Sequence, residues 1–95
     1  MMKSYTGTFT KTDGSPRLMH FVRLTDLPDT FLASRVKGSD ASEARTASRQ
    51  RMLAEGKETV WDIDANNFRV FNWNSVVEDV AELEIDDANF FENNA

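Results

Sequence analysis

Alternation of apolar and polar side chains predicts two strands at the start of the chain. In residues 3–11 two aromatic residues and a glycine share one face, while serine and threonine fill the other, as in a half-buried strand. Residues 12–16 contain an Asp-Gly pair that suits a tight turn. The apolar run of residues 17–24 then pairs back, so we predict an antiparallel hairpin.

Strand signals return in the second half of the chain. Residues 58–64 alternate again, residues 65–67 supply a turn, and residues 68–73 are strongly β-prone, which predicts a second hairpin. Residues 80–86 alternate apolar side chains with acids and predict a last strand. A helix over residues 75–84, started by a capping-box spacing, is the alternative.

The first hairpin is followed by a short segment that contains a proline. Because residue 27 is restricted by that proline and residues 27–32 are too short for a regular helix, we expect a loop or one 3₁₀ turn. Its apolar side chains, Leu27, Phe31 and Leu32, are expected to close one end of the core.

Residues 34–57 change character, because large apolar residues nearly vanish and Ser, Ala and Arg dominate. One interpretation is a mobile basic loop. The other is a peripheral helix over about 41–54, with Asp40 as N-cap, Glu43 completing a capping box and Gly56 just past its end. In both interpretations this segment is an insertion that contributes little to the core.

Charge is distributed unevenly along the 95 residues, whose formal net charge is −5. The first 60 residues hold ten of the eleven basic side chains and carry a net charge of +3, whereas residues 61–95 carry −8. The chain has no cysteine, so disulfides and cysteine-based metal sites are excluded. Length and composition indicate one small soluble domain, and no apolar run is long enough for a membrane span.

Basic residues in the segment between the hairpins form the first candidate binding site. They are Arg35, Lys37, Arg45, Arg49 and Arg51, with only Asp40 and Glu43 as acids among them. A solvated flexible loop explains such a run most simply. As a functional surface, the run would dock an acidic partner or nucleic acid, or fold against the chain's own acidic tail.

The C-terminal segment, residues 87–95, is acidic and contains two large apolar side chains, Phe90 and Phe91. Two such side chains are too few to offset the entropy of ordering this segment alone. We therefore predict a domain of residues 1–86 followed by a mobile acidic tail. The phenylalanine pair is then a docking element that orders only on a partner, and a tail without function is the alternative.

Aromatic residues in the second hairpin allow two interpretations. Trp61, Phe68, Phe71 and Trp73 lie close together in sequence, with Arg69 among them. Exposed aromatic rings beside basic residues stack nucleic-acid bases. Filling the interior of a small β domain is the more common role, and we expect core packing for most of them.

The sequence contains none of the common catalytic or nucleotide-binding motifs, so we expect a protein without enzymatic activity, metal or cofactor. The only histidine, His20, lies in a strand and is expected to be satisfied by one neighbour. Asp62 and Asp64 would share a strand face, but paired carboxylates without a histidine or a calcium-loop glycine are better interpreted as a solvated face.

The order of two hairpins, a one-turn connector and a closing strand outlines a small SH3-like barrel of about five antiparallel strands. FTKTDGSPRLMHFVRLTDLP (Phe9 to Pro28) and TVWDIDANNFRVFNW (Thr59 to Trp73) resemble the WYL-type, Sm-like SH3-barrel family of short proteins, found mainly in tailed bacteriophages and bacteria. The resemblance implies a mainly β barrel and a phage origin, with location in the host cytoplasm. It supplies no catalytic motif.

These observations favour a noncatalytic accessory or regulatory protein that binds another macromolecule. Because the net charge is negative, a protein partner, such as a host protein, is favoured over nucleic acid. The alternative is a nucleic-acid-binding module that uses residues 34–51 and exposed aromatic rings. A small-ligand sensor would rest on analogy of fold alone.

Overall fold

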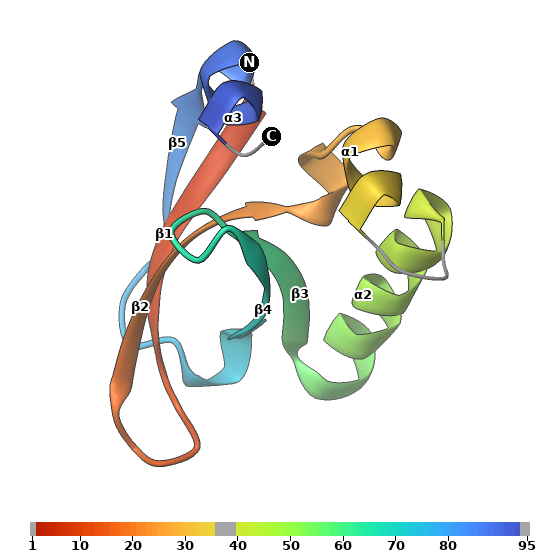
Figure 1. Cartoon of the computed structure of the whole chain (residues 1–95). Coiled ribbons are helices and arrows are strands. Elements are labelled where there is room, and N and C mark those ends of the chain that lie inside the picture. The colour runs from red at the N-terminus through yellow and green to blue at the C-terminus, as the bar shows by residue number, and fades with distance from the viewer. Residues whose placement is uncertain (1, 36–39, 94–95) are drawn as a thin grey trace.

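The structure is a computed structural model and describes residues 2–35 and 40–93. Its strands are β1 (Met2–Thr10), β2 (Pro16–Arg23), β3 (Lys57–Asp62), β4 (Asn67–Asn72) and β5 (Ala81–Ile85). Its α-helices are α1 (Asp29–Arg35), α2 (Ala41–Glu55) and α3 (Asp87–Asn93). All strand pairs are antiparallel, in the order β4-β3-β2-β1-β5, and α1 and α2 lie together beside the sheet (Figure 1). The expectation of a small, mainly β domain with five antiparallel strands is confirmed.

The first hairpin forms as predicted, with Tyr5 opposite Phe21 in the register of β1 and β2. The turn is closed by a hydrogen bond from the Lys11 N–H to the Ser15 carbonyl, at 2.8 Å. Gly14 has a φ of 88°, a conformation that favours glycine. Asp13 accepts hydrogen bonds from the hydroxyl and N–H of Ser15, and these lower the pKa of the Asp13 carboxyl.

The second hairpin is also confirmed, but β3 ends at Asp62 rather than at residue 64. The carboxylate of Asp62 accepts hydrogen bonds from the N–H groups of Asp64 and Ala65 and so begins the turn. Asp62 is only 3% exposed, which makes the predicted solvated face of two aspartates wrong. β5 pairs with β1, so the strand interpretation holds and the alternative helix over residues 75–84 is wrong.

The sheet is open, because the pairings of the described residues leave β4 and β5 as two outer edges. It is nevertheless curled. Phe9 of β1 contacts Phe71 of β4, with 5.0 Å between ring centroids, although β2 and β3 lie between these strands in the sheet. A bridge between Phe9 and Val76 ties the connection before β5 to the same place.

Apolar side chains pack on both faces of this curled sheet. The inner cluster lies inside the curl and consists of Phe9, Met19, Phe21, Val60 and Phe71. The outer cluster lies on the helix side and consists of Met2, Val22, Leu24, Leu27, Phe31, Leu32, Ala41, Trp61 and Phe90. Trp61 and Phe71 are at most 2% exposed, so the expected core role of these two aromatic residues is confirmed.

The connection after β2 is more regular than expected. Leu24–Asp26 form a 3₁₀ turn and α1 follows with seven residues, so the prediction of no regular helix is wrong. Leu27, Phe31 and Leu32 are buried, as predicted. A helix of seven residues is too short to be stable alone, and the burial of Phe31 and Leu32 in the outer cluster stabilises it.

α2 shows that the segment before β3 is a helix and not a loop. Asp40 accepts a hydrogen bond from the Glu43 N–H at 2.8 Å, and Gly56 ends the helix with a φ of 68°, as the capping pattern predicted. Only Ala41 and Ser48 are buried, which agrees with a peripheral helix. Residues 36–39 lie outside the described residues.

α3 differs from the sequence-based expectation of a tail that orders only on a partner. Phe90 is 5% exposed and lies 5.7 Å from Phe31, measured between ring centroids. Phe91 is half-buried and contacts the same ring. The expectation counted these two side chains alone, whereas they join a cluster that Met2 and Trp61 already form. Residues 94–95 lie outside the described residues.

Candidate functional site: a basic cleft along strand β4

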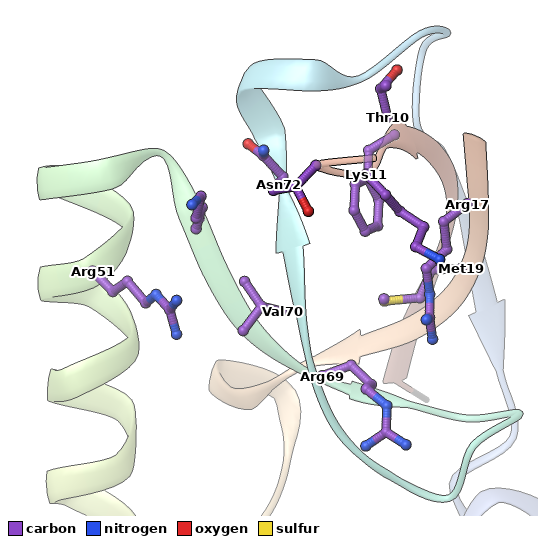
Figure 2. A pocket seen from close by; sticks show the side chains of 11 residues that line it. Thr10, Lys11, Arg17, Met19, Arg51, Arg69, Val70 and Asn72 are labelled. Carbon is purple, nitrogen blue, oxygen red and sulfur yellow. The ribbon is translucent and has the colours of Figure 1, made fainter. Parts of the chain in front are cut away.

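A hollow of about 320 Å³ lies along β4, between the end of the first hairpin and α2. Its charged lining residues are Lys11, Arg17, Arg51, Lys57 and Arg69. No acidic side chain of the described residues lines it. Figure 2 shows Arg51 on one side of β4 and Lys11 and Arg17 on the other, so the cations flank the strand. We call this hollow the basic cleft.

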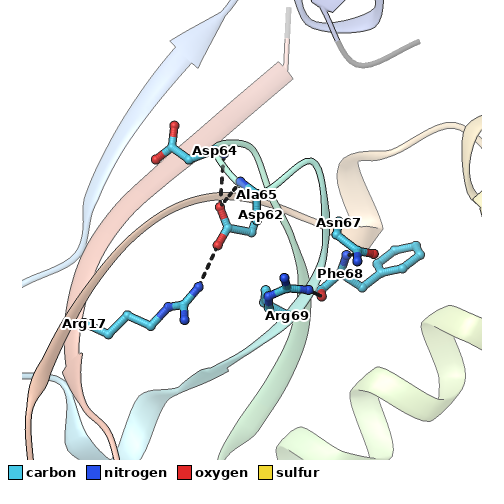
Figure 3. A network of polar contacts seen from close by, with 7 residues as sticks. All are labelled: Arg17, Asp62, Asp64, Ala65, Asn67, Phe68 and Arg69. Carbon is cyan, nitrogen blue, oxygen red and sulfur yellow. Dashed lines mark hydrogen bonds and ion pairs between the residues drawn. The ribbon is translucent and has the colours of Figure 1, made fainter.

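Arg17 is held in the cleft by a buried carboxylate. Its Nη2 lies 3.1 Å from Oδ2 of Asp62, whose other oxygen accepts the two turn N–H groups (Figure 3). The side chain of Asp62 is 5% exposed and that of Arg17 is 36% exposed. The pair thus fixes one terminal nitrogen of the guanidinium while part of the side chain remains accessible.

Arg51 is more loosely held. Its Nε lies 3.0 Å from Oε2 of Glu55, one turn further along α2, and both side chains are about half exposed. An exposed pair of this kind contributes about 0.3–0.5 kcal/mol. Arg51 therefore reorients toward a ligand at small cost.

Lys11, Lys57 and Arg69 form no ion pair with any residue that the structure describes. Arg69 donates a hydrogen bond from Nη1 to the carbonyl of Phe68 at 2.8 Å. Phe9, Met19 and Val70 supply the apolar part of the lining. The cleft therefore combines unneutralised positive charge with an apolar floor, a combination that suits an anionic ligand with some apolar character.

The other buried charge inside the curl is neutralised and does not belong to the cleft. Glu58 is 5% exposed and accepts hydrogen bonds from Arg23 Nε at 2.8 Å and from Trp73 Nε1 at 3.0 Å. The hydrogen bond to Glu58 raises the pKa of Arg23 above its usual value. This group ties β2, β3 and the end of β4 together.

Arg45, which the sequence indicated as a binding residue, has a structural role. It donates hydrogen bonds to the carbonyls of Leu24 and Leu27 and pairs with Asp29 at 2.6 Å. These contacts fasten α2 to the connection after β2. Arg45 does not line the basic cleft.

Two other predicted basic residues, Arg35 and Arg49, lie apart from the cleft. Arg35 stacks on Phe31, with its guanidinium carbon 4.4 Å from the ring centroid. Arg49 is exposed on α2 and does not line the cleft, and Lys37 lies outside the described residues. Of the predicted basic residues that the structure describes, Arg51 alone lines the basic cleft.

Four cleft residues were missed by sequence reasoning: Lys11, Arg17, Lys57 and Arg69. A weak signal existed for Lys11 and Arg17, because they flank the predicted turn on either side. Their approach to Arg69 depends on the curl of the sheet. That curl is a property of tertiary packing, and the alternation pattern of single strands does not contain it.

A second hollow has the opposite character. It lies near β5, is lined by Glu78, Asp79 and Glu82 together with Tyr5 and Trp73, and measures about 540 Å³.

The only histidine, His20, lies with its Nε2 3.3 Å from the hydroxyl of Ser4, as expected for a histidine satisfied by one neighbour. Among the described residues no three potential metal-ligating side chains come together.

Comparisons with known proteins do not extend this picture: no protein-family model, curated protein or solved structure matches the chain. Within the described residues, none of the helices has the length and apolar character that crossing a membrane requires. The candidate site therefore rests on the geometry of the basic cleft.

Proposed function

We propose that the protein is a noncatalytic binding module that holds an acidic segment of a partner protein in the basic cleft. The observation that carries this proposal is the concentration of five cations around one hollow, without an acid on its wall, in a chain of net charge −5. Three of them, Lys11, Lys57 and Arg69, form no ion pair with a described residue, and their mutual repulsion is relieved when an anionic ligand binds.

Two features favour an acidic protein segment over nucleic acid. Binding of single-stranded nucleic acid uses exposed aromatic faces, but Trp61 and Phe71 are buried and Phe68 packs edge-on against Trp61. The apolar floor of the cleft, formed by Phe9, Met19 and Val70, also suits the apolar side chains of a protein segment better than a phosphate backbone.

The test measures binding of a labelled, blocked octapeptide, Glu-Glu-Val-Val repeated twice, by fluorescence anisotropy at about 50 mM salt. Lys11→Glu and Arg69→Glu should each weaken binding by about tenfold or more, because a like charge then faces the ligand. Arg49→Glu is the matched control, since it makes the same change of charge on α2 outside the cleft.

Two results would overturn the proposal. One is absence of binding, or equal loss of affinity in all three variants, which would reduce the effect to net charge. The other is tighter binding of an oligothymidylate than of the octapeptide with the same dependence on Lys11 and Arg69, which would assign the cleft to nucleic acid.

The family resemblance adds a finer proposal about fold and setting. The curl that brings Phe9 onto Phe71 and the bridge from Phe9 to Val76 support an SH3-like, Sm-like barrel that is left partly open. A phage origin, a host protein as partner and a cytoplasmic location follow from the same resemblance. Proteins recovered from host lysate by the wild type but not by Lys11→Glu would test the identity of the partner.

A further inference from the structure

The outer edge of β4 has a defined pattern of main-chain groups. The Trp73 N–H donates to the Gly56 carbonyl, so the main-chain groups of Trp73 face the side of β3. The Ile63 N–H donates to the His20 carbonyl, so the main-chain groups of Ile63 face the side of β2. Because main-chain groups alternate between the two sides of a strand, the N–H and C=O groups of Arg69 and Phe71 point toward β3. Those of Phe68, Val70 and Asn72 point away from the sheet.

The start of this edge is already capped by side chains. The N–H of Phe68 donates to Oδ1 of Asn67 at 2.8 Å, and its carbonyl accepts from Nη1 of Arg69 (Figure 3). The outward main-chain groups of Val70 and Asn72 have no hydrogen bond to any residue that the structure describes. The edge is thus closed at Phe68 and open at Val70 and Asn72.

The open part of the edge coincides with the basic cleft. Val70 and Asn72 line the cleft, whereas Phe68 does not. Cations stand on both sides of β4 at this level, with Lys11 and Arg17 on one side and Arg51 on the other (Figure 2). An added strand points successive side chains to opposite faces of the sheet, so acidic residues on either face of it meet a cation.

We propose that an acidic, extended segment of a partner protein adds to the sheet as a sixth strand, hydrogen-bonded to the open edge of β4 at Val70 and Asn72. This inference rests on the proposed function and names the way in which the segment is held. Main-chain hydrogen bonds hold an added strand of any sequence, and the flanking cations select an acidic one.

The decisive experiment places two N-methyl groups on one or the other set of alternate residues of the ligand. In a bound strand, the N–H groups of alternate residues point toward β4 and the others point to solvent. The acidic octapeptide is therefore made in two forms, with N-methylation at the two central residues of either the odd or the even set. One form should bind roughly tenfold more weakly than the other, because it loses the hydrogen bonds to β4.

A protein variant tests the same contact from the other side. Val70→Pro removes an N–H that the ladder with β3 does not use, and proline is tolerated on edge strands in this position. The variant should keep its thermal midpoint within a few degrees and lose binding of the unmodified octapeptide. In the wild type, the amide resonances of Val70 and Asn72 should shift most on binding.

The outcomes separate this inference from the proposed function. If the octapeptide binds in a manner that depends on Lys11 and Arg69, but both N-methylated forms bind equally, the strand addition is wrong and the proposed function stands. If no acidic peptide binds, both fail. Self-association of the protein that Val70→Pro abolishes would make a second copy the occupant of the edge and would also overturn the inference.

Discussion

Strands β4 and β5 are the two outer strands of one sheet, but their surroundings differ. β4 lies beside five cations, and its residues Val70 and Asn72 line the hollow. β5 carries Glu82 and Glu84, lies near the acidic hollow, and exposes 56% of Leu83. One edge is therefore open and positive, and the other is exposed and negative.

The uneven distribution of charge along the sequence gives the two outer strands opposite charge. The order of strands places β1, which lies in the basic half of the chain, against β5 from the acidic half, and Lys3 pairs with Glu82 at 2.7 Å. Charged side chains on an edge discourage unintended pairing with another sheet edge. The acids on β5 disfavour an acidic strand there, so an acidic ligand is directed to β4.

Phe90, which is buried next to the acidic edge strand β5, gives the largest expected effect on stability. Phe90→Ala removes a ring buried against Phe31, directly after β5, and should cost about 3 kcal/mol. For a domain of this size, the thermal midpoint should fall by more than about ten degrees. Asn89→Ala, an exposed position on the same helix, is the control. A fall of less than about two degrees for Phe90→Ala would show α3 detached in solution, as the sequence alone suggested.

The contact of Gly7 with side chains from β4 and from the residue before β5 gives the next largest effect. A Cβ at Gly7 would lie 2.9 Å from both the ring of Phe71 on β4 and a methyl group of Val80 just before β5. Gly7→Ala should therefore destabilise the protein by about 1–2 kcal/mol through overpacking. Adding Val80→Ala should recover part of this loss in a double-mutant cycle. Strict additivity of the two substitutions would contradict the shared contact.

The ion pairs around β4 should differ in value. Arg17→Met leaves the buried carboxylate of Asp62 without its cation, although the two turn N–H groups remain, and should cost about 1 kcal/mol in urea unfolding. Arg51→Met breaks an exposed pair and should change the free energy of unfolding by less than about 0.5 kcal/mol. Equal effects would show that burial of Asp62 does not decide the difference.

The strands and the helix caps were predictable from sequence because their signals are local. Alternation located both hairpins, and Asp40, Glu43 and Gly56 located the ends of α2. The course of α1 and α3 was not predictable in the same way, because Phe31 and Phe90 are held by each other and by Trp61, far apart in sequence. Local propensity does not register that contact.

The candidate site was predicted less well than the fold, for a related reason. The run from Arg35 to Arg51 looked like a surface because its members are close in sequence. Arg35, however, ends α1, whereas Arg45, Arg49 and Arg51 lie on α2, and Arg45 donates to the carbonyls of Leu24 and Leu27. Lys11 and Arg69 are 58 positions apart and meet only because the sheet curls. Charge counts along the chain do not show such a grouping.

The smallest expected effect concerns the ion pair that joins β1 to the acidic edge. The hydrogen bond to Glu82 and its charge raise the pKa of Lys3 above its ordinary value of 10.5. A raised pKa in the folded state stabilises the protein fully below that ordinary value, and the contribution is lost as pH rises through the folded pKa. Both side chains are about half exposed, so salt should reduce the contribution.

Lys3→Met should accordingly lower the thermal midpoint slightly between pH 7 and about 9, and the two midpoints should converge above about pH 11. Lys11→Met, which breaks no ion pair with a described residue on the β4 side, should show no such convergence. A difference between wild type and Lys3→Met that grows from pH 9 to 11.5 would contradict the sign of the pKa shift. It would also show that β5 is held to β1 without help from this pair.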